Sequence, residues 1–109
     1  MKRNMNKYLI DFQGMKWESQ VSGVRYKAFI IGEQRLRLVE FSEEFSETDW
    51  CTKEHVGYVI AGSISIDFDG KLVNLKSGDG LFIPKGEANK HKGRIAKGDK
   101  ALIVFFEKV

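Results

Sequence analysis

The chain has 109 residues, of which 42% are hydrophobic, and this length suits one domain with one core. Its net charge of +3 and its pI near 9.0 raise the question of nucleic-acid binding. The basic residues are scattered, however, and no zinc-finger, RNP-type or basic-helix pattern accompanies them, so we expect a solvated surface and no nucleic-acid partner.

The N-terminal segment, residues 1–7, is basic, and the apolar run that follows it covers only residues 8–10. That run is too short for a signal-peptide core or a membrane span. The single cysteine cannot form an intramolecular disulfide, which agrees with a reducing compartment. We therefore expect a cytoplasmic protein without a membrane partner, and we expect its first seven residues to be flexible.

Residues 25–31 and 35–41 are predicted to form a hairpin that turns through Gly32. In the second strand Arg35, Arg37 and Val39 share one face, because side chains alternate along a strand. Arginines directed into a barrel could hold an anion, whereas arginines directed outward would only add solubility, and we expect the outward orientation. The acidic stretch 42–49 is predicted to be an exposed loop or a short helical turn.

Short, evenly spaced strands are predicted for the rest of the chain. Residues 55–62 and 63–68 alternate as two strands meeting at Gly62, and Asp69 and Gly70 are typical of a tight hairpin turn before a return strand at 71–76. Residues 81–83 form a short strand that Pro84 ends. Residues 101–106 are almost continuously apolar, as in a strand buried against the core on one face and against a partner subunit on the other. The pattern indicates an all-β sandwich or barrel.

The turn residues of this region resemble those of the cupin family. The second cupin motif, G(X)5PXG(X)2H(X)3N, is matched by Gly78, Pro84 and Gly86, and Gly62 stands where the first motif, G(X)5HXH(X)3–4E(X)6G, ends. The resemblance implies an all-β, single-domain cupin-type double-stranded β-helix, a jelly-roll barrel, over residues 1–109. Small cupin-like barrels commonly pair through their sheets, so we expect a homodimer.

The cupin metal ligands are mostly replaced. His55 stands at the family's glutamate, Asn89 at the second motif's histidine, and Gly93 at its asparagine. The chain has two histidines, so it cannot build a three-histidine site. Cys51, His55 and His91 form a conceivable sulfur and nitrogen set for one divalent transition metal, zinc or iron. Possible oxygen donors are Asp49, Glu54 and Glu87. Alternatively, the cysteine is an inert buried residue and the histidines only hydrogen-bond their neighbours.

Two functions remain open. The first is a barrel that binds a small polar metabolite, such as a sugar or an organic acid, in a pocket lined by Trp50, Tyr58, His55, Asn89 and His91, to which Trp17 and Phe82 could add stacking surfaces. The second is a metal-dependent isomerase, dioxygenase or lyase that uses the Cys/His site. The depleted ligand set favours the first. We find no phosphate-binding loop or nucleophile elbow, so nucleotide hydrolysis and serine-type hydrolysis are excluded.

Overall fold

The computed structural model describes residues 8–109, so the prediction for residues 1–7 lies outside the described part of the chain. The described residues form eight strands and two short 3-10 helices. The helices are η1 (Phe12–Gly14) and η2 (Glu87–Asn89). The strands are β1 (Glu18–Val21), β2 (Val24–Ile31), β3 (Gln34–Phe41), β4 (His55–Phe68), β5 (Lys71–Lys76), β6 (Gly80–Ile83), β7 (Lys92–Arg94) and β8 (Ala101–Lys108). Within the described residues, no helix is long and apolar enough to cross a membrane.

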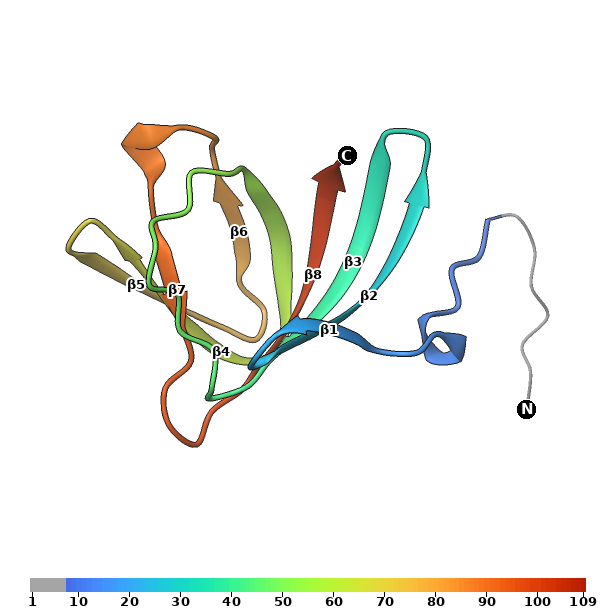
Figure 1. The fold of residues 1–109 in the computed structure, drawn as a ribbon, viewed down its shortest axis with the longest axis horizontal. Coiled ribbons are helices and arrows are strands. Elements are labelled where there is room, and N and C mark those ends of the chain that lie inside the picture. Colours follow the sequence, from blue (N-terminus) through green and yellow to red (C-terminus); the bar gives the residue numbers. More distant parts are fainter. Residues whose placement is uncertain (1–7) are drawn as a thin grey trace.

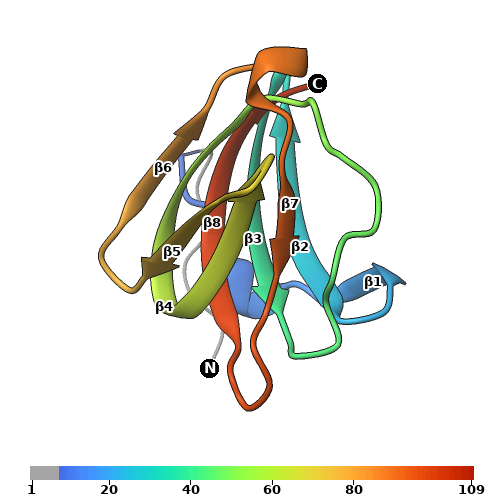
Figure 2. The same ribbon diagram turned by 90° about the vertical axis from the view of Figure 1, so that its left-hand side faces the viewer.

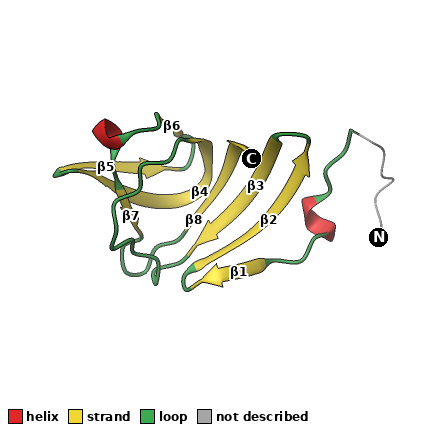
Figure 3. Cartoon of the chain, turned by 45° about the horizontal axis from the view of Figure 1, so that its top comes forward, coloured by secondary structure: helices red, strands yellow, loops and turns green. Residues whose placement is uncertain are grey.

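The strands form a strongly curved sheet with the order β1-β2-β3-β8-β4-β5, and β6 and β7 also pair with β4 (Figure 1). The first half of β4 pairs with β8 and β6, whereas its second half pairs with β5 and β7. Strand β4 therefore belongs to a larger sheet, which also contains β1, β2, β3, β8 and β6, and to a smaller sheet with β5 and β7. Figures 2 and 3 show these strands curving around one concave side.

The two strands expected to meet at Gly62 are one continuous strand, which corrects the prediction. The pairing of β4 with β8 shifts between Val59 and Ala61, and Gly62 follows with a φ of 78°. A Cβ atom at Gly62 would lie 1.8 Å from the carbonyl oxygen of Lys100. The bulge and the glycine bend the strand without ending its hydrogen bonding, so it passes from one sheet into the other.

Both predicted hairpins are present. Ile31 pairs with Gln34 across the β2–β3 turn, and Phe68 pairs with Lys71 across the β4–β5 turn. The second turn places Asp69 at a φ of 54° and Gly70 at 99°, as the Asp-Gly sequence indicates. The acidic stretch 42–49 contains no helix and runs as a loop, with an isolated bridge from Ser46 to Arg94.

The hydrophobic core covers the concave face, and its largest fully buried side chains are Val39, Val59 and Ile103. The burial of Val39 shows which face of β3 points into the core. Because side chains alternate, Arg35 and Arg37 share the concave face with Val39, and the expected outward orientation of these arginines is wrong. The opposite, outer face of the larger sheet is only partly covered in this chain, since Phe106 of β8 is 56% exposed there.

Candidate functional site

The concave face brings Cys51, His55 and His91 together from three segments of the chain. Cys51 precedes β4, His55 begins it, and His91 lies between η2 and β7. The Cys51 N–H donates to the His91 carbonyl oxygen over 2.8 Å, and the His91 N–H donates to the Cys51 carbonyl oxygen over 3.0 Å. One possible ligand atom from each of the three side chains lies within 4.8 Å of the others. The predicted metal-ligand residues therefore converge.

The hydrogen bond of His91 leaves one of its ring nitrogens available to a metal. Its Nδ1 lies 3.1 Å from the carbonyl oxygen of Asn89. A carbonyl oxygen can only accept, so Nδ1 carries the proton and Nε2 keeps its lone pair in the neutral ring. A hydrogen bond from the other ring nitrogen to a backbone carbonyl is the usual support of a metal-ligating histidine. Asn89 thus contributes to the site through its backbone.

His55 is held as a neutral ring with one unsatisfied nitrogen. Its Nε2 lies 3.5 Å from the Cys51 Sγ, while its buried Nδ1 has no hydrogen-bond partner within the described residues. Burial lowers the pKa of His55 from 6.5 to about 4, and the neighbouring His91, whose ring centroid is 5.1 Å away, acts in the same direction. The ring is therefore unprotonated near neutral pH, which is the state that can ligate a metal.

The three side chains fit a transition metal chemically. One sulfur and two imidazole nitrogens are donors that suit Zn²⁺ or Fe²⁺ rather than Mg²⁺ or Ca²⁺. The unsatisfied Nδ1 of His55 is a buried polar atom, and such atoms normally have a partner. The carboxylates that the sequence offered as oxygen donors, Asp49, Glu54 and Glu87, are exposed and do not belong to the cluster.

A second group of charged residues lies on the same concave face and was not predicted as part of the site. Glu107 of β8 accepts hydrogen bonds from the Nε of Arg35 over 2.8 Å and from the Nε and Nη2 of Arg37 over 2.9 and 2.7 Å. The Arg37 guanidinium also lies over the rings of Tyr26 and Phe105. The alternation of Arg35 and Arg37 with Val39 was the signal in the sequence that could have placed them here.

The aromatic residues proposed as ligand contacts are not all brought to the cluster. Trp50 is 38% exposed and lies against the ammonium groups of Lys90 and Lys92, at 5.1 and 4.4 Å. Tyr58 points to the outer face of β4, because it alternates with Gly57 and Val59 on the strand, and it is 47% exposed. Trp17 stacks with Arg25 and Lys27 on the β2 strand, and Phe82 is exposed.

Gly57, which lies two residues after His55 on the same face of β4, serves close packing. A Cβ atom at Gly57 would lie 2.6 Å from the Val104 carbonyl oxygen and 3.0 Å from the Phe105 ring. Gly57 therefore allows β8 to approach β4 closely.

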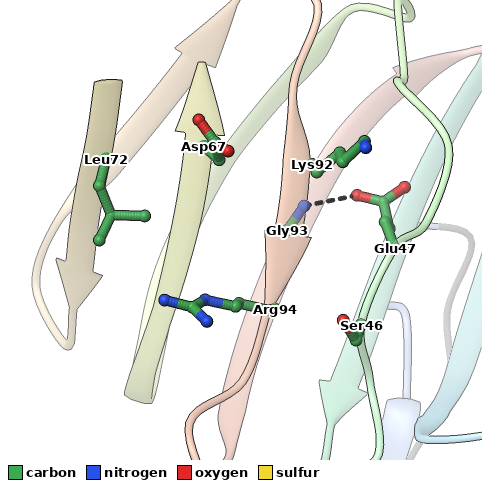
Figure 4. A pocket seen from close by; sticks show the side chains of 7 residues that line it. All are labelled: Ser46, Glu47, Asp67, Leu72, Lys92, Gly93 and Arg94. Atoms are coloured by element: carbon green, nitrogen blue, oxygen red, sulfur yellow. Dashed lines mark hydrogen bonds between the residues drawn. The ribbon is translucent and has the colours of Figure 1, made fainter. Parts of the chain in front are cut away.

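Two hollows lie outside this cluster. One, of about 270 Å³, is lined by Asp67, Leu72, Lys92, Arg94, Gly93, Ser46 and Glu47, and Figure 4 shows Glu47 accepting a hydrogen bond from the Gly93 N–H. Its acidic and basic side chains balance. The other, of about 510 Å³, is lined by apolar residues of the outer face of the larger sheet, among them Phe29, Ile31, Leu36, Val56 and Phe106, and also by Arg35 and Glu107.

Comparison with known families identifies the chain. The family model of the ethanolamine utilisation protein EutQ matches residues 25–105, from the start of β2 almost to the end of β8. The chain belongs to the EutQ family. No curated protein sequence matches it.

Solved structures similar to this EutQ-family chain confirm the cupin fold. The polyketide cyclase RemF from Streptomyces resistomycificus aligns with a TM-score of 0.81 at 20% identity, covering 95% of this chain and 80% of its own. An RmlC-like cupin from Shewanella frigidimarina aligns at 0.68 and 16% identity, covering 93% and 91%. The Clostridium difficile EutQ protein aligns at 0.62 and 24% identity, covering 76% of this chain and 60% of its own. The sequence resemblance to cupins is therefore confirmed, together with the jelly-roll fold.

Proposed function

We propose that this EutQ-family cupin holds one divalent transition metal, Zn²⁺ or Fe²⁺, at Cys51, His55 and His91 and binds a small polar metabolite on the concave face beside it. The observation that carries the proposal is the convergence of one sulfur and two imidazole donors within 4.8 Å. The hydrogen bond from His91 Nδ1 to Asn89 supports it, because it orients the ring and leaves Nε2 free.

The residues of the chain have separable parts in this site. Cys51 and His91 are positioned by their mutual backbone hydrogen bonds, and His55 is positioned by the start of β4. The aromatic rings of Phe68 and Phe105 pack against the two histidines and keep water from that side. When bound, the metal would supply Lewis acidity to a ligand oxygen. The expected cytoplasmic location belongs to the same proposal, because a free cysteine stays reduced there.

An enzyme is the second candidate, and the number of protein donors favours it. Three protein ligands are typical of catalytic zinc sites, in which a further position takes water or substrate, whereas structural sites have four. An isomerase, a dioxygenase or a lyase would each fit a site of this kind. RemF, which is similar in fold, is a polyketide cyclase, and this supports the idea that such a barrel can carry catalysis.

Elemental analysis of the untagged protein, purified without chelator, tests the metal. We expect near-stoichiometric zinc or iron in the wild type and in Glu54→Gln, a matched control that removes an exposed carboxylate next to the cluster in sequence. Cys51→Ser and His55→Ala should lose the metal while remaining folded. A cobalt-substituted wild type should show a sulfur-to-cobalt absorption band that Cys51→Ser removes. Metal retained in both cluster variants would overturn the proposal.

We also propose that the chain forms a homodimer through the outer face of its larger sheet. Several large apolar side chains are exposed on that face, at Ile31, Tyr58, Ile60, Phe82 and Phe106. Ile31 and Phe106 line the hollow of about 510 Å³, whose lining also includes Glu54 and Lys108, residues of opposite charge. A second copy supplies both the apolar surface and the complementary charges that such a face requires.

A further inference from the structure

Three charged side chains form a cluster on the concave face: Arg35, Arg37 and Glu107. We call its two arginines the arginine pair. Two guanidinium groups share one carboxylate, which leaves a net charge of +1. The side chain of Glu107 is 10% exposed, and those of Arg35 and Arg37 are 31% and 24% exposed. Glu107 is therefore enclosed by its partners, while solvent still reaches both arginines.

Unused hydrogen-bond donors accompany the unbalanced charge. Arg37 approaches Glu107 with its Nε and Nη2, whereas Arg35 uses its Nε alone. Within residues 8–109, both terminal nitrogens of Arg35 and the Nη1 of Arg37 have no hydrogen-bond partner. A guanidinium presents paired N–H groups in a planar fork that matches a carboxylate.

The arginine pair lies next to the Cys51, His55 and His91 cluster through Phe105. Phe105 of β8 is paired with Arg37 of β3 on one side and with Gly57 of β4 on the other. The guanidinium carbon of Arg37 is 5.6 Å from the centre of the Phe105 ring, and the His55 ring centroid is 5.9 Å from it. One ring therefore separates the two groups, and a small molecule could contact both.

We propose that the arginine pair binds the carboxylate group of a small organic acid, whose second oxygen donor reaches toward Cys51, His55 and His91. The proposal rests on the proposed function, because it names the chemical class of the metabolite for the same concave face. One carboxylate balances the single positive charge and takes the free donors of Arg35. A sugar without a charged group would leave both unused.

Nuclear magnetic resonance of the arginine Nε–Hε groups tests the proposal directly. The untagged protein, as purified and after chelation, is titrated with sodium succinate, with neutral succinamide, and with sodium chloride at equal ionic strength. We expect saturable shifts of the Arg35 and Arg37 signals with succinate alone. Arg25 is the internal control, because it pairs with Glu40 on the outer side of the same sheet.

Variants separate this inference from the metal proposal. Arg35→Gln should weaken succinate binding by about tenfold or more, since a charged hydrogen-bonded pair is lost, while Arg25→Gln should leave it unchanged. The metal content of both variants should equal that of the wild type. Equal succinate binding by Arg35→Gln and wild type, or equal shifts with succinamide, would overturn the carboxylate subsite. Absence of metal with intact succinate binding would overturn only the metal.

Discussion

The two histidines of the chain differ in how their rings are supported. His91 is 3% exposed and hydrogen-bonded to the Asn89 carbonyl, whereas the buried Nδ1 of His55 has no partner in the described part of the chain. Burial accordingly lowers the pKa of His55 to about 4. The metal-free protein thus keeps this ring neutral over a pH range in which the same side chain in the unfolded chain takes up a proton.

This difference predicts a pH dependence of stability. As the pH falls below 6.5, His55 becomes protonated in the unfolded chain, whereas in the folded chain its pKa is about 4. Between these two values the unfolded chain binds more protons, so the free energy of unfolding falls as the pH falls. By pH 5.5 the loss is about 1 kcal/mol after allowance for the partial exposure of the ring. Urea unfolding of the chelated protein at pH 7.5, 6.5 and 5.5 measures it. His55→Gln should flatten the dependence, and an equal slope in that variant would contradict the assignment.

Metal binding predicts a stabilisation that depends on Cys51. A ligand that binds only the folded chain adds about 2.7 kcal/mol at a free concentration one hundred times its Kd. Thermal unfolding with and without zinc should show this increase in the wild type and in Glu54→Gln. Cys51→Ser should show a much smaller one. An equal shift in Cys51→Ser would place the bound zinc elsewhere on the protein.

At the scale of elements, the bend of β4 connects the two sheets. The bulge between Val59 and Ala61 and the positive φ of Gly62 turn the strand while its hydrogen bonds continue into β5 and β7. The Lys100 carbonyl lies where a side chain at Gly62 would have to go, and the Ser63 N–H donates to that carbonyl over 3.0 Å. Only glycine satisfies both the backbone angle and the close approach.

We therefore expect Gly62→Ala to be far more damaging than a glycine replacement at an open turn. Gly62→Ala should lower the free energy of unfolding by about 3 kcal/mol or more, because backbone strain and a steric clash add. Gly78→Ala is the matched control. Gly78 also has a positive φ, of 96°, but nothing lies within 4 Å of its added Cβ, so about 1 kcal/mol is expected. Chemical denaturation of both variants compares them, and equal losses would show that the clash is relieved.

Most strands could be predicted from the sequence because local signals define them, whereas β1 and β7 were not predicted. Alternation identified β2, β3 and β5, and Asp69-Gly70 marked a hairpin through its backbone angles. The continuity of β4 could not be predicted, because a glycine that ends a strand and a glycine that bends one have the same sequence context. Their difference lies in the partner strand, here the approach of Lys100, which is distant in the sequence.

The candidate site was predictable only in part, for a similar reason. Spacing suggested Cys51, His55 and His91, but their convergence depends on the pairing of Cys51 with His91 across forty residues of chain. Alternation placed Arg35 and Arg37 on one face of β3 but did not say which face is concave. That follows from the burial of Val39 against Val59 and Ile103, which the sheet order creates.

At the scale of the whole molecule, the proposed homodimer can be tested at one side chain. Phe106 is 56% exposed and lines the apolar hollow on the outer face of the larger sheet. Phe106→Ser should shift the mass measured by light scattering from that of two chains toward that of one, because a central aromatic contact is lost. Leu72→Ser, on β5 of the smaller sheet and 49% exposed, is the matched control and should leave the mass unchanged. A monomeric wild type would contradict the dimer.

The backbone pairing of Cys51 with His91 also bears on how the protein would acquire its metal. Two hydrogen bonds hold these segments together before any ion arrives, and β4 fixes the position of His55. The ion would bind to residues that the fold already holds in position. In a zinc finger, by contrast, metal binding drives the folding of the chain. The metal ion could then bind and dissociate reversibly while the protein stays folded. The metal found in a purified sample would therefore reflect the metals available during growth as much as the selectivity of the site.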